Sequence, residues 1–254
     1  VYTRDLKPMM KRSAMRRLVF GAMLTLAIPT LTTAAPICTT GTLAEYVALG
    51  SGGCMVGSAL FADFGTSVLN PLATAIEPGE ISVAPLITGS TVGLAFLLDA
   101  TAGAGELLDV LIRYEVTGLN GLSFIANSLS MSGSAVDPDG VVTAVEEKCA
   151  GGNFQGPDPS TVCAGNTVGP LIVFDIGLDS DLLESAFLSS PASFFDVFTE
   201  IAIDGGLDGQ AALGIVTNEF DFTPTQTVIP EPATLLLLSS GLAGAFVRRR
   251  RRRS

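Results

Sequence analysis

The sequence predicts an all-β protein, an antiparallel β-sandwich with one or two short helices. Apolar residues alternate with polar ones in many short segments, and clusters of Gly, Ser, Thr, Asp and Pro separate these segments every few residues. The mean hydropathy of +0.50 is high. Between the two ends of the chain, however, no uncharged apolar run reaches the roughly 18 residues of a membrane-spanning helix, so the apolar excess there indicates a protein core.

The expected strands follow from this alternation. In residues 108–116 the apolar positions alternate with Asp109, Arg113 and Glu115, which is typical of a half-buried strand with one polar face. Residues 195–203 alternate in the same way, and further strands are expected at residues 81–87, 91–98, 124–131, 141–146, 171–176 and 211–220. Turn residues at 137–140 and 204–206 separate them. Eight or so short strands predict two sheets that bury alternate faces against each other.

Two short helices are expected beside these strands. Thr42 followed by Glu45 forms a capping box, the apolar residues of 43–47 fall on one face, and Gly50 suits the position after a helix end. The first helix is therefore predicted at residues 42–49. A second is expected at residues 181–188.

Three parts are expected along the chain. Residues 1–35 are typical of a secretory signal peptide: basic residues precede the uncharged run 18–31, and small residues follow it. Residues 1–8 precede Met9, Met10 and Met15, any of which could be the start, so residues 1–8 could be untranslated. An uncleaved signal anchor is the alternative reading. Residues 36–229 are expected to form one acidic passenger domain, and residues 230–254 a C-terminal transmembrane tail.

Charge is segregated along the chain. The whole sequence has 25 acidic and 14 basic residues, but residues 36–229 hold 23 of the acids and only two bases, Arg113 and Lys148, a formal charge of −21. A surface this acidic repels phosphate backbones, so a nucleic-acid partner is not expected. Such a surface attracts Ca²⁺ and other cations. We expect no required cofactor, with Ca²⁺ as the cation to consider.

The C-terminal segment combines three features. Pro230, Glu231 and Pro232 come first, and fifteen apolar or small residues follow. As a helix these reach about 22 Å, short of the roughly 30 Å hydrocarbon layer. The chain then carries six arginines, which the positive-inside rule retains in the cytoplasm: Arg248, Arg249, Arg250, Arg251, Arg252 and Arg253. The segment is therefore expected to insert in the inner membrane and hold the passenger on the far side.

This order of motif, short apolar helix and terminal arginine cluster resembles the PEP-CTERM sorting domain. The resemblance implies an exosortase as partner, removal of the tail, and delivery to the cell surface or to an exopolysaccharide-rich extracellular matrix of a Gram-negative bacterium. An ordinary C-terminal membrane anchor is the alternative.

Four cysteines in an exported chain indicate two disulfides. Of the three connectivities, Cys38 with Cys54 and Cys149 with Cys163 is favoured because each pair closes a local loop. Zinc is the rival use of these thiols, but the chain has no Cys-x-x-Cys and no histidine.

Candidate catalytic residues are few. The absence of histidine excludes sites that need imidazole, and Gly-x-Ser-x-Gly does not occur. No metal site is expected, and Asp137 with Asp139 is only a weak candidate for one. Three acid pairs could in principle serve a glycosidase or bind calcium: Asp137/Asp139, Glu146/Glu147 and Asp179/Asp181. We expect all three pairs to be solvated turn or edge residues.

Two classes of function follow for the passenger. The first is a non-enzymatic surface or matrix protein that binds polysaccharide or is glycosylated. The second is a calcium-assisted carbohydrate-binding module or a weak glycoside hydrolase, which would require several carboxylates to converge at one place.

Overall fold

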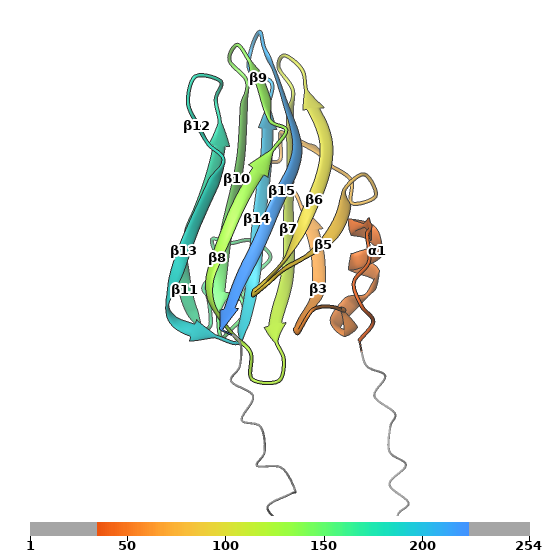
Figure 1. The fold of residues 1–254 in the computed structure, drawn as a ribbon. Coiled ribbons are helices and arrows are strands. Elements are labelled where there is room, and N and C mark those ends of the chain that lie inside the picture. Colours follow the sequence, from red (N-terminus) through yellow and green to blue (C-terminus); the bar gives the residue numbers. More distant parts are fainter. Residues whose placement is uncertain (1–34, 224–254) are drawn as a thin grey trace, which may run out of the picture. The chain divides into compact units, whose positions relative to one another are not determined.

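The structure is a computed structural model, and it describes residues 35–223. The expected signal peptide and the sorting tail lie outside the described residues, apart from the last residue of the former. Within the described part, two sheets pack face to face (Figure 1). All pairs of strands in them are antiparallel except the short β4, which runs parallel to β7. The predicted β-sandwich is confirmed.

The first sheet contains the long strand β15 at its centre. Its order across the sheet is β1 (Gly41–Thr42), β5 (Ser82–Thr88), β6 (Thr91–Ala102), β15 (Gln210–Thr223), β8 (Ser123–Ser132) and β13 (Leu183–Ala192), and the short β9 (Ala135–Asp137) also pairs with β15.

The second sheet is built around β14. Its order is β12 (Ser180–Asp181), β11 (Asn166–Asp175), β10 (Val141–Ala150), β14 (Phe194–Asp204), β7 (Leu107–Gly118), β3 (Ala59–Ser67) and β2 (Cys54–Val56), with β4 (Thr74–Ala75) beside β7.

The first predicted helix is present as α1 (Leu43–Ala48), followed by the 3₁₀ turn η1 (Gly50–Gly52). Both halves of the capping box form: the Thr42 hydroxyl accepts from the Glu45 amide, and the Glu45 carboxylate accepts from the Thr42 amide. Gly50 adopts φ +55°, a left-handed conformation that glycine adopts at little cost. The helix lies against β3 and β5, at one side of the sandwich (Figure 1).

The second predicted helix is wrong. Residues 181–188 form the end of β12 and most of β13, which pairs with β8 in the register Glu184 to Leu129. Every second side chain of this segment, at Glu184, Ala186 and Leu188, is half-buried, while the residues between them are exposed. The short apolar run in this segment fits both the helical period of 3.6 and the strand period of two. Pairing with the free edge of β8 therefore determined that it forms a strand.

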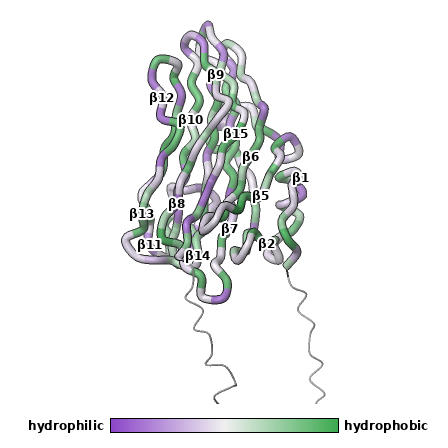
Figure 2. Tube along the Cα trace, viewed as in Figure 1, coloured by the Kyte–Doolittle hydropathy of each residue, from purple (hydrophilic) through white to green (hydrophobic). Residues whose placement is uncertain are grey.

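The core lies between the two sheets. Five rings meet there, Phe61, Tyr114, Phe124, Phe195 and Phe220, each 0% exposed and each with a neighbouring centroid within about 6 Å. Figure 2 shows the apolar residues distributed along the strands of both sheets. The eight predicted strands all contribute to the sandwich. The long strands β3 and β13 and the short strands β1, β2, β4, β9 and β12 were not predicted.

A second, smaller apolar cluster covers the outer face of the second sheet. It contains Leu111, Phe154 and Phe198, together with Cys149, and it lies beneath the loop that follows β10. Arg113 holds this loop to the sheet. Its guanidinium pairs with Asp196 at 2.6 Å and donates to the carbonyl of Gly156. The polar face expected on β7 is therefore partly covered, and Asp109 is only 1% exposed because its carboxylate accepts the amides of residues 69 and 70.

Both disulfides have the pairing that the sequence favours. Cys38 bonds Cys54, which ties the N-terminal segment to β2, and Cys149 bonds Cys163, which closes the loop over the second cluster. The described residues hold no free cysteine.

Candidate functional site

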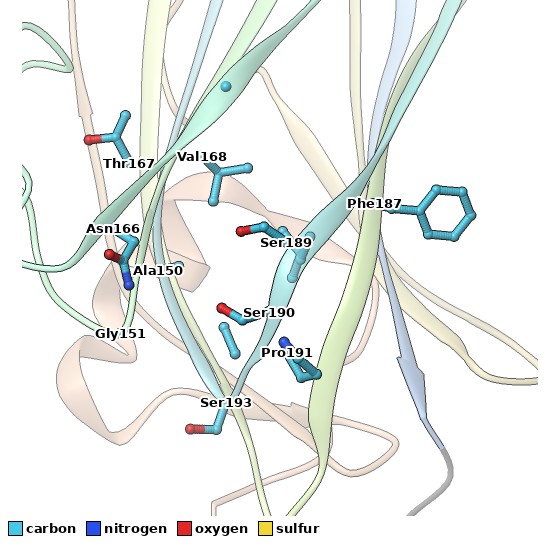
Figure 3. Close-up of a pocket in the computed structure, with 13 residues that line it drawn as sticks. Ala150, Gly151, Asn166, Thr167, Val168, Phe187, Ser189, Ser190, Pro191 and Ser193 are labelled. Carbon is cyan, nitrogen blue, oxygen red and sulfur yellow. The ribbon is translucent and has the colours of Figure 1, made fainter.

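A groove of about 450 Å³ opens where the ends of β10, β11 and β13 meet (Figure 3). The pairing of β13 with β8 is irregular between Phe187 and Ala192. Pro191 lies in this stretch and has no amide to donate to a neighbouring strand. The departure of residues 188–191 from regular pairing leaves the space between the edges of the two sheets unfilled.

Small polar side chains line much of this groove. Figure 3 shows the hydroxyls of Ser189 and Ser190 on the side of β13 that faces Val168, and the ring of Phe187 on the opposite side. Phe187 is among the lining residues, but its ring is 86% exposed and lies on the side of β13 away from the serines, where it is available at the surface.

None of the described residues that line the groove has an ionisable side chain. The serine and threonine hydroxyls in the groove are weak nucleophiles unless a neighbouring base activates them, and no such base is among the described lining residues. Hydroxyl and amide groups can instead donate to and accept from a neutral, hydroxyl-rich ligand. The sequence did not identify this groove, because it depends on an irregularity in strand pairing that no local pattern reveals.

The three acid pairs do not come together. The Asp139 carboxylate accepts the amides of Leu207 and Asp208, so it braces the turn between β14 and β15, and Asp137 ends the short β9. Asp181 lies in the two-residue strand β12, two residues after Asp179. Among residues 35–223, no group of three or more His, Cys, Asp or Glu side chains is placed to hold a metal ion.

The expectation that all three acid pairs are solvated is wrong for Glu146. Glu146 is 0% exposed, because the inward face of β10 consists of Val142, Ala144, Glu146 and Lys148. Lys148 is also 0% exposed, and its Nζ lies 2.7 Å from Glu146 Oε1. Burial raises the pKa of Glu146 above its ordinary value, although the charge and hydrogen bond of Lys148 oppose this.

Asn127 completes this buried group from the opposite sheet. Its side-chain Nδ2 donates to the same Glu146 Oε1 at 3.0 Å, and Asn127 is 1% exposed. In the described part of the chain, Asn127 Oδ1 and Glu146 Oε2 have no hydrogen-bond partner. The period of two in a strand places positions 142, 144, 146 and 148 on one face, so the sequence contained a signal that Glu146 and Lys148 face the core.

A second polar contact lies in the same core. Asn218 donates to the Tyr114 hydroxyl at 2.9 Å and to the Thr199 hydroxyl at 2.6 Å. Burial and the nearby Glu146 raise the pKa of Tyr114 well above its ordinary value, so Tyr114 stays protonated.

The sorting residues Pro230, Glu231 and Pro232 and the six terminal arginines lie outside the described residues. Within residues 35–223, no helix has the length and apolar character needed to cross a membrane.

Comparison with known proteins gives one family match. Residues 228–252 match the family described as the PEP-CTERM protein-sorting motif. No curated protein matches this chain.

Two solved structures share a limited likeness to it. TmCBM61, solved in complex with β-1,4-galactotriose, is 13% identical, with 63% of this chain and 85% of that chain covered and a TM-score of 0.26. CBM86, a low-affinity xylan-binding module from the gut symbiont Roseburia intestinalis, is 13% identical, with 63% and 96% covered and a TM-score of 0.22. At these TM-scores the likeness carries no argument about function, and the fold is assigned from the strand pairing.

Proposed function

We propose that this chain, which carries the PEP-CTERM protein-sorting motif of exported proteins, is delivered to the cell surface or the exopolysaccharide-rich extracellular matrix of a Gram-negative bacterium, where its passenger acts without catalysis. The motif match at residues 228–252 is the observation that carries the proposal. It indicates sorting by an exosortase and a C-terminal membrane-anchoring signal. Final destination and the role of the passenger are the proposed parts.

The character of the passenger supports this destination. Two disulfides are typical of oxidising compartments outside the cytoplasm. A formal charge of −21 over residues 36–229 favours solubility and repels nucleic acids. A signal peptide at residues 1–35 would supply the route out of the cytoplasm.

A non-enzymatic role is supported by the chemistry of the described surface. The groove beside β13 has no ionisable side chain, and the acid pairs are spread over different turns and strands. Histidine is absent from the whole sequence. No cofactor is therefore part of the proposal.

The test of sorting uses the native host. Chains truncated after Ile229 are compared with the full chain in cells with and without a functional exosortase, by fractionation and by intact mass of the recovered protein. We expect the full chain to lose its tail and reach the surface only when the exosortase is present, and the truncated chain to miss that destination. Substitution of Pro230 and Pro232 by alanine provides a variant of unchanged length. Identical destinations for full and truncated chains would contradict the proposal.

A second candidate function is polysaccharide binding at the groove. The specific observation that favours it is the row of hydroxyls from Ser189 and Ser190 in a groove with no charged lining. Neutral sugars present the same kind of groups, and small polar clefts with precise hydrogen-bonding groups recognise them.

Filling the groove tests this second function. Ser189→Leu places an apolar side chain in the groove, and Ser185→Leu makes the same change on the same strand outside it. We expect the first variant, and not the second, to lose retention on insoluble neutral polysaccharides and on exopolysaccharide from the host. Equal retention of both variants and the unaltered protein would exclude binding at this groove.

A further inference from the structure

The only lysine of the passenger is completely buried. Lysine is seldom fully buried, because removing an ammonium group from water costs several kcal/mol. Residues 36–229 contain one other base, Arg113, which is partly exposed and paired with Asp196. Lys148 instead points into the core, and its cross-strand neighbours on β14 and β11 are Val197 and Val168. An apolar residue at this position would fill the core without that cost.

The two groups near Lys148 are those that amide chemistry requires. Lys148 Nζ and Asn127 Nδ2 contact the same oxygen, Glu146 Oε1, at 2.7 and 3.0 Å. An amine and a carboxamide therefore meet at one carboxylate oxygen. Lys148 and Glu146 come from β10 in the second sheet, whereas Asn127 comes from β8 in the first sheet. The three side chains are each at most 1% exposed, so water does not compete with the amine.

We propose that Lys148 and Asn127 form an intramolecular isopeptide bond that joins the two sheets, with Glu146 as the proton-transfer group. The amine of Lys148 attacks Cγ of Asn127, so that an Nζ–Cγ bond forms. The Cγ–Nδ2 bond then breaks, and the amide nitrogen leaves as ammonia. Starting from the neutral pair, the carboxylic acid of Glu146 gives its proton to the departing nitrogen and then takes one proton from Nζ, so that Glu146 ends unchanged as the acid. No oxidant, reductant or cofactor is required.

The surroundings favour each step of this reaction. Transfer of a proton from the ammonium to the carboxylate removes two charges from an apolar interior, and it gives the neutral amine that the reaction needs. Only the neutral amine is a nucleophile. Burial raises the pKa of Glu146, in the direction that lets it hold the transferred proton. The fold also keeps the reacting groups close together, which replaces a bimolecular encounter by an intramolecular one.

The orphan polar atoms agree with a protonated Glu146. Glu146 Oε2 and Asn127 Oδ1 are both buried without a partner in the described part of the chain. A proton on Oε2 turns one of these acceptors into a donor, which is the form of Glu146 that can give a proton to the departing nitrogen. The product amide also removes the buried amine, which lowers the cost of the ion pair in the core.

The bond would be a covalent cross-link between the two sheets. Lys148 follows Asn127 by 21 positions in the sequence, and the bond would close a ring through β9 and the turn before β10. For a protein outside the cell, such a bond resists unfolding where reduction would open a disulfide. The formation of the bond does not depend on the proposed sorting or on polysaccharide binding.

Intact mass of the oxidised, folded protein followed by full reduction tests the proposal. We expect the unaltered chain to weigh one ammonia less than its sequence requires, after the hydrogens of the two disulfides are accounted for. Trypsin gives an independent measurement, because Arg113 and Lys148 are the only cleavage sites between residues 36 and 229. After unfolding and reduction, trypsin should cut after Arg113 and fail to cut after Lys148. A full mass together with complete cleavage after Lys148 would overturn the proposal and leave a simple buried ion pair.

Matched variants assign the atoms. Asn127→Asp should change the loss from one ammonia to one water, because the departing group changes. Asn218→Asp alters a buried asparagine whose amide donates to Tyr114 and Thr199 instead, and it should keep the ammonia loss. Glu146→Gln should abolish the bond or slow it strongly. A bond formed as fast in Glu146→Gln as in the unaltered protein would refute the proton-transfer role. If a variant fails to fold, the mass of the unaltered chain still decides whether the bond exists.

Discussion

The loop closed by Cys149 and Cys163 gives the sharpest stability prediction. We consider Cys149→Ala combined with Cys163→Ala. In the chain-entropy description, a disulfide stabilises mainly by restricting the unfolded chain, and a loop of about 15 residues contributes about 3 kcal/mol. The two cysteines are 14 positions apart. The expected loss in the free energy of unfolding is therefore about 3 kcal/mol.

The folded loop should remain in place without its disulfide. The Phe154 amide donates to Asp196 at 2.9 Å, the Phe154 ring lies 4.9 Å from that of Phe198, and Arg113 reaches the carbonyl of Gly156. These contacts involve backbone groups and side chains of residues that the double variant keeps. The change should therefore act through the unfolded state, which becomes less compact and exposes more surface.

Guanidinium unfolding without added oxidant or reductant measures both the free energy of unfolding and, through the denaturant slope, the surface exposed on unfolding. We expect a lower midpoint and a larger dependence on denaturant, since the denaturant slope scales with the surface exposed. The matched control is Cys38→Ala with Cys54→Ala, which opens a loop of sequence separation 16 and so should cost nearly the same. A loss below about 1 kcal/mol with an unchanged slope would refute the chain-entropy reasoning. A difference of several kcal/mol between the two pairs would do so as well.

Three further changes test other parts of the structure. Burial raises the pKa of Glu146, Glu147 and Glu200 above the ordinary 4.5, so the folded state binds protons more tightly than the unfolded state and loses stability as the pH rises through the raised pKa values. Denaturant unfolding should therefore give a higher free energy of unfolding near about pH 5 than near about pH 7, and an equal or lower free energy at the acidic pH would contradict this. Gly93→Ala should destabilise by about 1–3 kcal/mol or more, because its Cβ would lie 2.2 Å from the Asn218 carbonyl oxygen, while Gly65→Ala, with no atom within 4 Å, should change the thermal midpoint little. Phe220→Ala should lower the free energy of unfolding by about 3–5 kcal/mol in denaturant unfolding, since this fully buried ring contacts three other phenylalanines. A loss below about 1 kcal/mol would show that the core tolerates removal of the ring.

Local chemistry explains why much of the fold was predictable. The capping box of Thr42 and Glu45 acts within four residues, and it specifies the start of α1 without any tertiary contact. Period-two alternation identified β7 and β14 because a sandwich strand buries one face, whatever its neighbours are. The local disulfide pairs were predictable for the same reason, since each joins residues close in sequence.

Alternation failed where a strand has a covered outer face or lies at an edge. Asp196 faces away from the main core, yet it is 0% exposed because the disulfide-bonded loop folds over it. The segment 183–188 became an edge strand because β8 offered unpaired backbone groups, a condition that depends on residues more than 50 positions earlier.

The sequence by itself determined the charge segregation, the sorting motif at residues 228–252, the β class and the paired cysteines, because each depends on composition or on neighbours in the chain. Only the tertiary structure brought Asn127 to Glu146 and Lys148, and only it opened the groove beside Ser189, because these sites depend on which strands of the two sheets face each other. Strand parity indicates which side chains point inward, but sheet packing decides what they meet there.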